Sequence, residues 1–167
     1  MNKKQGLGIF FLLASLVFPA NANPGEIHGK IISVIDGNTI EFVGVENDTF
    51  KLVLNGIDCP ELGQAFGDVA KTYLEKLVVG KEAVVVIEGK DRFGNKIGSV
   101  RLNKGRDPRL ELLEQGLAWT SEKNPNPQFE TIKEMAKSAG KGLWQQQNPE
   151  APWIFRRQQT MLAPKSN

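Results

Sequence analysis

The hydrophobic pattern of this chain changes its period at one short acidic run, residues 54–61, which reads Leu-Asn-Gly-Ile-Asp-Cys-Pro-Glu. Three strand-like segments separated by turn-forming residues lead into this run, at 27–35, 39–43 and 49–57, and the last of them overlaps it. They predict a three-stranded meander that ends at the acidic run. After the run, apolar residues recur at helical spacing over 66–78 and stop at Gly80, which predicts one amphipathic helix against the sheet.

Two more strands and two more helices are expected after this first helix. The strand segments are 83–87 and 97–102. Each later helix begins with a capping residue followed by a proline in the first turn, at Asp107-Pro108 and at Asn126-Pro127. This order of elements predicts an α+β fold, a five-stranded OB-fold β-barrel with three packed helices.

The first 22 residues have the pattern of a signal peptide. Lys3 and Lys4 precede an apolar stretch at 6–18 that is too short to span a bilayer comfortably, and Ala20-Asn21-Ala22 forms a small-residue cleavage site. A retained membrane anchor is the alternative. With cleavage we expect a secreted or periplasmic protein without a membrane span. Its expected parts are a signal peptide at 1–22, a domain at 23–157 and a flexible tail at 158–167.

Charge and cysteine content limit what can be argued about partners and stability. The chain carries 21 basic and 19 acidic side chains, and removal of Lys3 and Lys4 leaves 19 of each. The net charge of the mature chain therefore gives no support for nucleic-acid binding. Cys59 is the only cysteine, so no intramolecular disulfide can form and stability must come from packing. We expect a monomer.

Asp58 and Glu61 flank a proline, and we call this pair the acidic corner. Pro60 fixes its own backbone and holds Cys59 extended, so the two carboxylates leave a rigid corner and can converge on one hard cation. The same pattern also serves as a helix start, with Asp as the cap and Glu in the first turn. Cys59 itself is expected to be a small, partly buried residue or to offer its backbone carbonyl to an ion. The residues alone leave these alternatives open.

Six motifs, in chain order, resemble those of the staphylococcal nuclease (thermonuclease) family. They are Ile-Asp-Gly-Asn-Thr at 35–39, Gly-Ile-Asp-Cys-Pro-Glu at 56–61, Asp-Arg-Phe-Gly at 91–94, Gln-Gly-Leu-Ala-Trp at 115–119, Gly-Leu-Trp at 142–144 and Pro-Trp-Ile-Phe-Arg-Arg at 152–157. The resemblance covers nearly the whole mature chain. It implies an OB-fold barrel with three helices, in agreement with the pattern above, and a secreted calcium-dependent phosphodiesterase acting on DNA and RNA.

The resemblance also implies metal and catalytic roles for residues at and near the acidic corner. It makes Asp58 a direct calcium ligand, gives Cys59 a backbone carbonyl ligand and sets Asp36 near the ion. A second family aspartate, also a direct ligand, is Asn38 in this chain. Glu61 matches the glutamate that positions or activates the attacking water. Because calcium affinity follows the number of charged ligands, Asn38 predicts weak calcium binding.

Two arginines that clamp the phosphate in the family are missing here. The position three residues before the Gly-Ile-Asp motif is Val53, and the position after Asp-Arg-Phe-Gly is Asn95. Lys51 and Lys96 are the candidate substitutes, although an ammonium lacks the planar fork that matches a phosphate. Phe93 stands at an aromatic position that contributes to nucleotide binding in the family, without the hydroxyl found there.

Three functions remain in view, and the substitutions favour the first. It is a secreted nuclease-fold protein with little or no catalysis that binds nucleic acid, another anionic polymer or a protein. The second is an active calcium-dependent endonuclease with a rearranged site that uses Asp58 and Glu61. The third is a stable extracytoplasmic domain without a ligand at this site. A guanidinium close to the acidic corner, for instance from Arg92 or Arg101, would overturn the argument for a silent enzyme.

Overall fold

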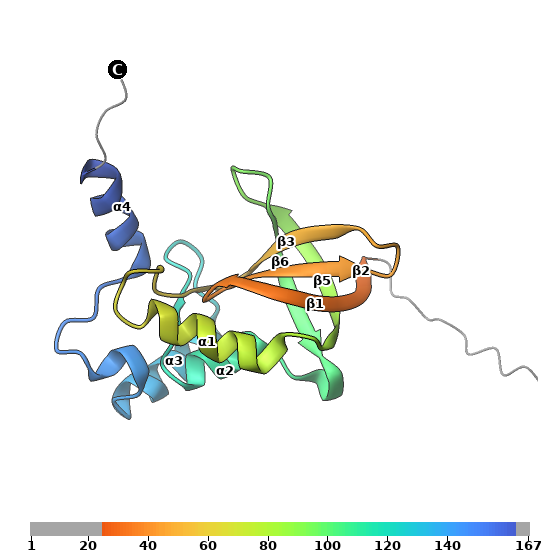
Figure 1. The fold of residues 1–167 in the computed structure, drawn as a ribbon. Coiled ribbons are helices and arrows are strands. Elements are labelled where there is room, and N and C mark those ends of the chain that lie inside the picture. The colour runs from red at the N-terminus through yellow and green to blue at the C-terminus, as the bar shows by residue number, and fades with distance from the viewer. Residues whose placement is uncertain (1–24, 163–167) are drawn as a thin grey trace, which may run out of the picture.

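A closed five-stranded barrel with helices gathered at one end forms the body of the computed structural model, which describes residues 25–162 (Figure 1). The barrel strands are β1 (Glu26–Asp36), β2 (Thr39–Gly44), β3 (Thr49–Leu54), β5 (Glu82–Lys90) and β6 (Lys96–Leu102). They follow the order β1-β2-β3-β6-β5, and β1 also pairs with β5. Four of these pairings are antiparallel and the β3–β6 pairing is parallel. The predicted barrel is therefore confirmed.

The core lies inside the barrel and between the barrel and the helices. In β2 every second residue is buried, as expected of a strand with one face turned to a core. The largest side chains with at most 1% exposure come from both layers: Ile31, Phe42, Leu52, Val85 and Val100 from strands, and Leu74 and Leu112 from helices. Each such side chain contributes about 1.5–3 kcal/mol when it is fully buried.

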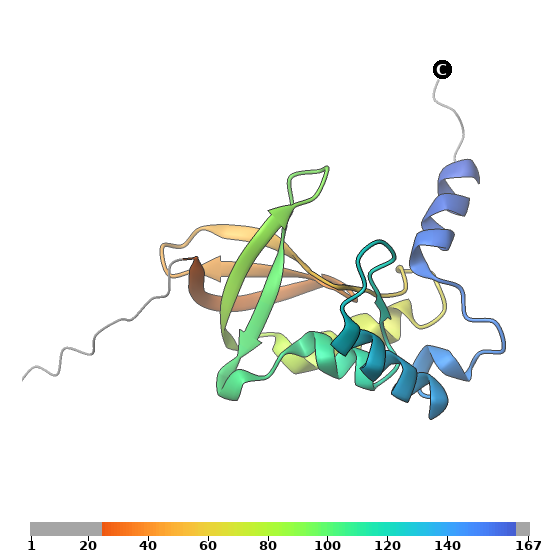
Figure 2. The same ribbon diagram turned by 180° about the vertical axis from the view of Figure 1, so that it is seen from behind.

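Three helices pack at one end of the barrel and a fourth stands apart from them (Figures 1 and 2). They are α1 (Gly67–Val78), α2 (Pro108–Glu114), α3 (Pro127–Ser138) and α4 (Pro152–Leu162), with short 3-10 turns at Asn103–Gly105 and Gly142–Gln145. The predicted caps of α2 and α3 are confirmed. Asp107 accepts a hydrogen bond from the backbone N–H of Arg109 at 2.9 Å, and Asn126 accepts one from Gln128 at 2.8 Å.

The fourth helix adds to the three that the sequence predicts. The predicted boundary between domain and tail after Arg157 falls inside α4, because this helix continues to Leu162. The predicted signal peptide at 1–22 and the end of the predicted tail at 163–167 lie outside the described residues. Across residues 25–162, no helix has both the length and the apolar character needed to cross a bilayer.

The sequence had predicted that the third barrel strand runs up to the acidic corner. In the structure the corner begins instead in a separate small sheet. β3 ends at Leu54, and Gly56 takes a φ of 84°, a left-handed conformation that suits glycine and ends the ladder. The chain then forms β4 (Ile57–Asp58), which pairs antiparallel with β7 (Trp119–Thr120). This pairing holds the corner at the junction between barrel and helices.

Candidate functional site

A groove of about 610 Å³ opens beside the acidic corner, at the 36–39 turn, the loop joining β5 to β6, and the first residues of α4. That loop and α4 rise on the same side of the barrel (Figure 1). Most of the predicted site residues line the groove: Asp36, Asn38, Lys51, Val53, Asp58, Glu61, Phe93 and Asn95. The sequence motifs therefore converge on one place.

The turn between β1 and β2 packs directly on the acidic corner. Asp36 Oδ1 accepts a hydrogen bond from the backbone N–H of Asn38 at 2.9 Å, which closes the turn. Asn38 Oδ1 in turn accepts one from the backbone N–H of Cys59 at 3.2 Å. A Cβ on Gly37 would lie 2.5 Å from that of Cys59, so only glycine allows this approach. One side-chain oxygen of Asp36 and the side-chain oxygen of Asn38 are thus used to hold the turn against the corner.

Cys59 is a buried structural residue, in agreement with one of its predicted roles. Its side chain is 2% exposed and its S–H donates to the carbonyl of Gly37 at 3.2 Å. Burial raises the pKa of the thiol well above its ordinary value, and the charge of Asp58 raises it further. A thiol that stays protonated is neither a nucleophile nor a thiolate ligand.

Arg156 of α4 binds both carboxylates of the acidic corner. Its Nη1 and Nη2 donate to Oδ1 and Oδ2 of Asp58 at 3.0 and 2.7 Å, and Nη1 also donates to Glu61 Oε1. The hydrogen bonds that Arg156 donates to Asp58 are the main reason that the pKa of Arg156 lies above its ordinary value. Sequence reasoning missed this contact, which spans 98 residues, although the motif at 152–157 contains the arginine.

The positions of the two missing arginines carry no positive charge. Val53 lies in β3 opposite Ile97 of β6, and both line the groove. Asn95 donates its backbone N–H and its side-chain Nδ2 to Asp91, at 2.9 and 2.8 Å. The Asn95 side-chain hydrogen bond is the main cause that lowers the pKa of Asp91. Asn95 therefore stabilises its own loop.

The candidate substitutes differ in where they lie. Lys51 lines the groove. Lys96 is not among its lining residues, and its Nζ lies 3.5 Å from the ring centroid of Phe50. Arg101 pairs with Glu26 at 2.9 Å. Arg92 lines the groove with its guanidinium 4.7 Å from the ring centroid of Phe93. The guanidinium at the acidic corner thus comes from α4 and from neither arginine named in advance.

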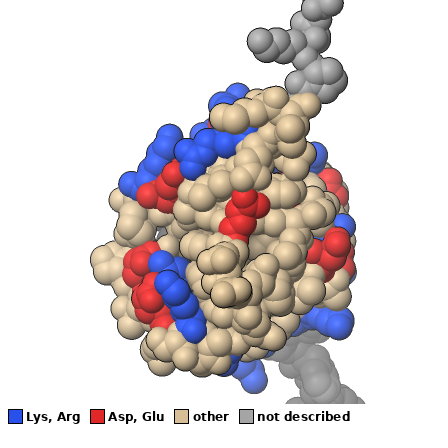
Figure 3. Space-filling view, turned by 90° about the vertical axis from the view of Figure 1, so that its left-hand side faces the viewer, with Lys and Arg blue, Asp and Glu red and all other residues tan. Residues whose placement is uncertain are grey.

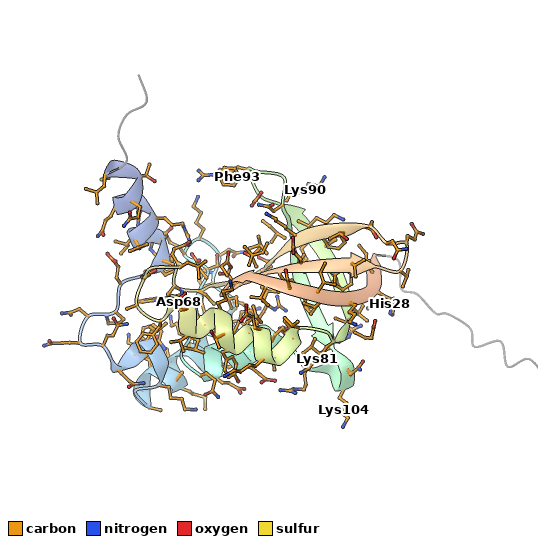
Figure 4. The ribbon with its side chains drawn as sticks, viewed as in Figure 1. His28, Asp68, Lys81, Lys90, Phe93 and Lys104 are labelled. Carbon is orange, nitrogen blue, oxygen red and sulfur yellow. The ribbon has the colours of Figure 1, made fainter. Side chains whose placement is uncertain are left out.

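Aromatic residues flank the groove on two sides. Phe93, 75% exposed, lies in the loop that joins β5 to β6 (Figure 4). Trp153 lines the groove from α4, and its ring centroid lies 5.6 Å from that of Trp119, which in turn lies 4.6 Å from Trp144. The tryptophans therefore dock α4, while Phe93 has a free face on which a base could stack.

The residues assigned to calcium by resemblance do not form a fitting site in this arrangement. Both carboxylate oxygens of Asp58 accept from Arg156, and the side-chain oxygen of Asn38 accepts from Cys59. Within residues 25–162, no group of three or more His, Cys, Asp or Glu is arranged to hold a metal ion. A divalent cation at the corner would have to displace the guanidinium.

The surface at the helical end carries both signs of charge. In Figure 3, several Lys and Arg side chains lie directly beside Asp and Glu, while one acidic group near the middle of the view is surrounded by uncharged surface. Arg157 pairs with Glu122, a lining residue of the groove, at 3.5 Å. Because neither sign of charge dominates this end, the binding of a polyanion there would depend on individual basic side chains.

Comparison with known proteins points to one family. The profile of a family described as "Staphylococcal nuclease homologue" matches residues 51–146. A protein of Escherichia coli O157:H7 named an uncharacterized endonuclease is 32% identical over 132 residues, which cover 78% of this chain and 86% of that protein. One of the same name in Haemophilus influenzae is 34% identical, covering 78% and 73%. A protein of Shigella flexneri named micrococcal nuclease is 31% identical, covering 79% and 82%.

Proposed function

The chain belongs to the staphylococcal nuclease family, and we propose that it is a nucleic-acid-binding member in which phosphodiester hydrolysis is strongly reduced. The observation that carries this proposal is the lack of a cation at positions 53 and 95. Val53 can donate no hydrogen bond, and the amide of Asn95 is bound to Asp91. Both residues line the groove in which a phosphate would lie.

The loss of these cations bears on rate because phosphoryl transfer depends mainly on positioning and on charge. The transition state spreads negative charge over the oxygens of the transferred group, and an arginine directed at it is typically worth about 10³ to 10⁵ in rate. Such losses are seldom additive. One missing arginine already accounts for a large reduction.

Calcium enters the proposal as a weak ligand. Asn38 contributes an amide oxygen where a charged carboxylate would bind more strongly, and Asp58 is paired with Arg156.

The proposal includes a monomeric protein that is secreted or periplasmic after cleavage near Asn23. Amino-terminal sequencing of protein from cell fractions would test the cleavage site and the location together.

A second candidate function is an active endonuclease with a rearranged site. It is favoured by the guanidinium of Arg156 beside Asp58 and Glu61. This contact meets the condition stated above for overturning the argument for a silent enzyme, so the first proposal rests on the missing cations at positions 53 and 95 and the assay below decides between the two functions. In this reading Glu61 acts on the attacking water and Arg156 takes the role of a missing arginine.

An assay on single-stranded DNA and RNA, with calcium or with chelator, separates these functions. We expect binding that weakens as salt rises, because phosphate contacts release counterions, and cleavage that is slow under all conditions. Rapid, chelator-sensitive cleavage that is lost in Glu61→Ala would establish the second candidate. Neither binding nor cleavage would leave a domain without a ligand at this site.

A reversal variant provides the reference rate for the assay. We expect the combination of Asn38→Asp, Val53→Arg and Asn95→Arg to raise the cleavage rate by at least about 10³-fold, the lower value for one transition-state arginine. Circular dichroism checks that the variant is folded. A folded variant that remains inert would count against the assignment of these three positions.

A further inference from the structure

The guanidinium of Arg156 is hydrogen-bonded along one of its two edges. The edge formed by Nη1 and Nη2 holds Asp58, and Nη1 also donates to Glu61. Of the five N–H donors in a guanidinium, this leaves the Nε–H and one Nη2–H. In the described part of the chain these two donors have no hydrogen-bond acceptor. They lie parallel on the second edge, and such a fork matches two oxygens of a phosphate.

The acidic corner and α4 are positioned by a shared buried side chain. Gln64 is 9% exposed. Its Oε1 accepts from the backbone N–H of Glu61 at 3.0 Å, and its Nε2 donates to the carbonyl of Glu150 at 2.7 Å. Glu150 lies two residues before α4 begins at Pro152. The corner and the helix that carries Arg156 are therefore held in register by one residue.

The second edge of Arg156 belongs to a half-exposed side chain in the groove. The side chain lines the groove and is 48% exposed, whereas Asp58 beneath it is 18% exposed. Its first edge is taken by the carboxylates, so the donors that remain for a ligand are those of the second edge. Lys51 and Lys123 line the same groove and add positive charge to it. Phe93, on the loop across the groove, offers a ring to a base next to the bound phosphate.

The ion pairs of Arg156 with Asp58 and Glu61 matter more for the charge of the groove than for the stability of the fold. Half-exposed ion pairs contribute about 0–1 kcal/mol to folding. Their other effect is to set one permanent positive charge between Asp58 and Glu61, on the carboxylate of Asp58 that the resemblance assigns to calcium. A calcium ion and the guanidinium would compete for the same oxygens.

We propose that Arg156 is the resident cation of this site: it neutralises the acidic corner and binds a backbone phosphate of nucleic acid through its second edge, without calcium. This inference rests on the proposed nucleic-acid binding and names the group responsible for it. The family resemblance predicts a bound calcium ion and arginines at the positions of Val53 and Asn95. Here the cation is a side chain of the protein itself, and it comes from α4.

The test compares three variants of the full chain for binding to a single-stranded DNA oligonucleotide in the presence of chelator. Arg156→Gln is expected to weaken binding about tenfold or more, since a charged bidentate contact is lost. Arg156→Lys is expected to remain at least about fivefold weaker than the parent, because an ammonium cannot hold Asp58 and also present a fork. Arg157→Gln, the matched control, removes the same charge from the adjacent residue, which pairs with Glu122, and is expected to stay within about twofold.

Calorimetric titration with calcium chloride alone gives a second reading that does not involve nucleic acid. Removal of the competing guanidinium is expected to raise calcium affinity in Arg156→Gln about tenfold and to leave it unchanged in Arg157→Gln. Near-ultraviolet circular dichroism confirms that α4 remains docked through its tryptophans in each variant.

The outcomes separate the inference from the function on which it rests. If the parent binds DNA in chelator but Arg156→Gln and Arg157→Gln weaken binding equally, the inference is wrong and the binding function stands. Binding that requires calcium, or tighter binding by Arg156→Gln, also overturns it, the latter because Arg156 would then block the groove. No DNA binding by the parent under any condition removes the proposed function itself.

Discussion

Cys59 is the residue on which the 36–39 turn and the acidic corner meet. Its N–H binds Asn38 and its S–H binds Gly37, so the only thiol of the chain is used entirely for structure. The sequence allowed either a partly buried small residue or a backbone carbonyl ligand; the structure shows the side chain fully buried, and the carbonyl role stays a prediction. That choice depended on how closely the turn approaches, which no local pattern encodes.

We expect the Cys59 thiol to resist modification until the protein unfolds. Its pKa is raised by burial, so the thiolate that reacts with disulfide reagents is scarce in the folded state. Above the ordinary value of 9.0 the unfolded thiol ionises while the folded one stays neutral, so the free energy of unfolding should fall as pH rises beyond 9.0. Reaction with a chromogenic disulfide and urea unfolding between pH 7 and 11 measure both effects. Rapid labelling of the native protein would contradict the burial of Cys59.

The lack of an arginine at positions 53 and 95 could be recognised from single residues, whereas the contact of Arg156 with the acidic corner could not be predicted. Val53 and Asn95 precede or follow motifs at strand ends, and strand ends of a barrel meet in a predictable place. Arg156 reaches the corner only because Trp153 docks on Trp119 and Gln64 holds Glu150. Such docking depends on tertiary contacts that a motif does not reveal.

Helix α4 illustrates how an element can form without a strong local signal. Its buried residue is Pro152 at the first position, and Ile154, Met161 and Leu162 are exposed. The sequence predicted a family motif at 152–157 and a flexible tail from 158, but no helix through Leu162. α2 and α3, by contrast, follow from an N-cap and a proline, a signal contained within two residues.

We expect Gln64→Ala to loosen α4 more than it disturbs the barrel. The substitution removes the hydrogen bonds that join Glu61 to Glu150, and because their partners are only part-buried the cost should lie below the range of about 1–3 kcal/mol for a fully buried unsatisfied group. Hydrogen exchange should become faster in α4 and remain slow in β1 and β5. Gln158→Ala is the control, because Gln158 also binds Glu150 but from an exposed position. Unchanged exchange in α4 would show that the tryptophans alone hold the helix.

The barrel as a whole explains why two separate substitutions act on one groove. Parallel pairing of β3 with β6 sets Val53 opposite Ile97, two residues after Asn95. The order of strands and helices was enough to predict the barrel and its class. The parallel closure and the break at Gly56 were not predicted, since they depend on long-range pairing and on one left-handed residue.

The contact between Asp58 and Arg156 should act on unfolding and hardly on folding. It joins residues 98 positions apart across two docked layers, and contacts of such long range that lie outside a barrel are expected to form late. Arg156→Gln should therefore speed unfolding and leave the refolding rate nearly unchanged. Stopped-flow measurements in urea test this, with Arg157→Gln as the reference. Slower refolding of Arg156→Gln would place the contact in the folding nucleus.

Late formation of this contact orders the assembly of the site. A chain with a closed barrel and an undocked α4 would leave the charges of Asp58 and Glu61 without the guanidinium that compensates them. In such a chain a solution cation could reach both carboxylates, and the groove would lack the wall that α4 provides. Docking of α4 thus changes the corner from a site open to cations from solution into a surface whose charge is set by a side chain of the protein.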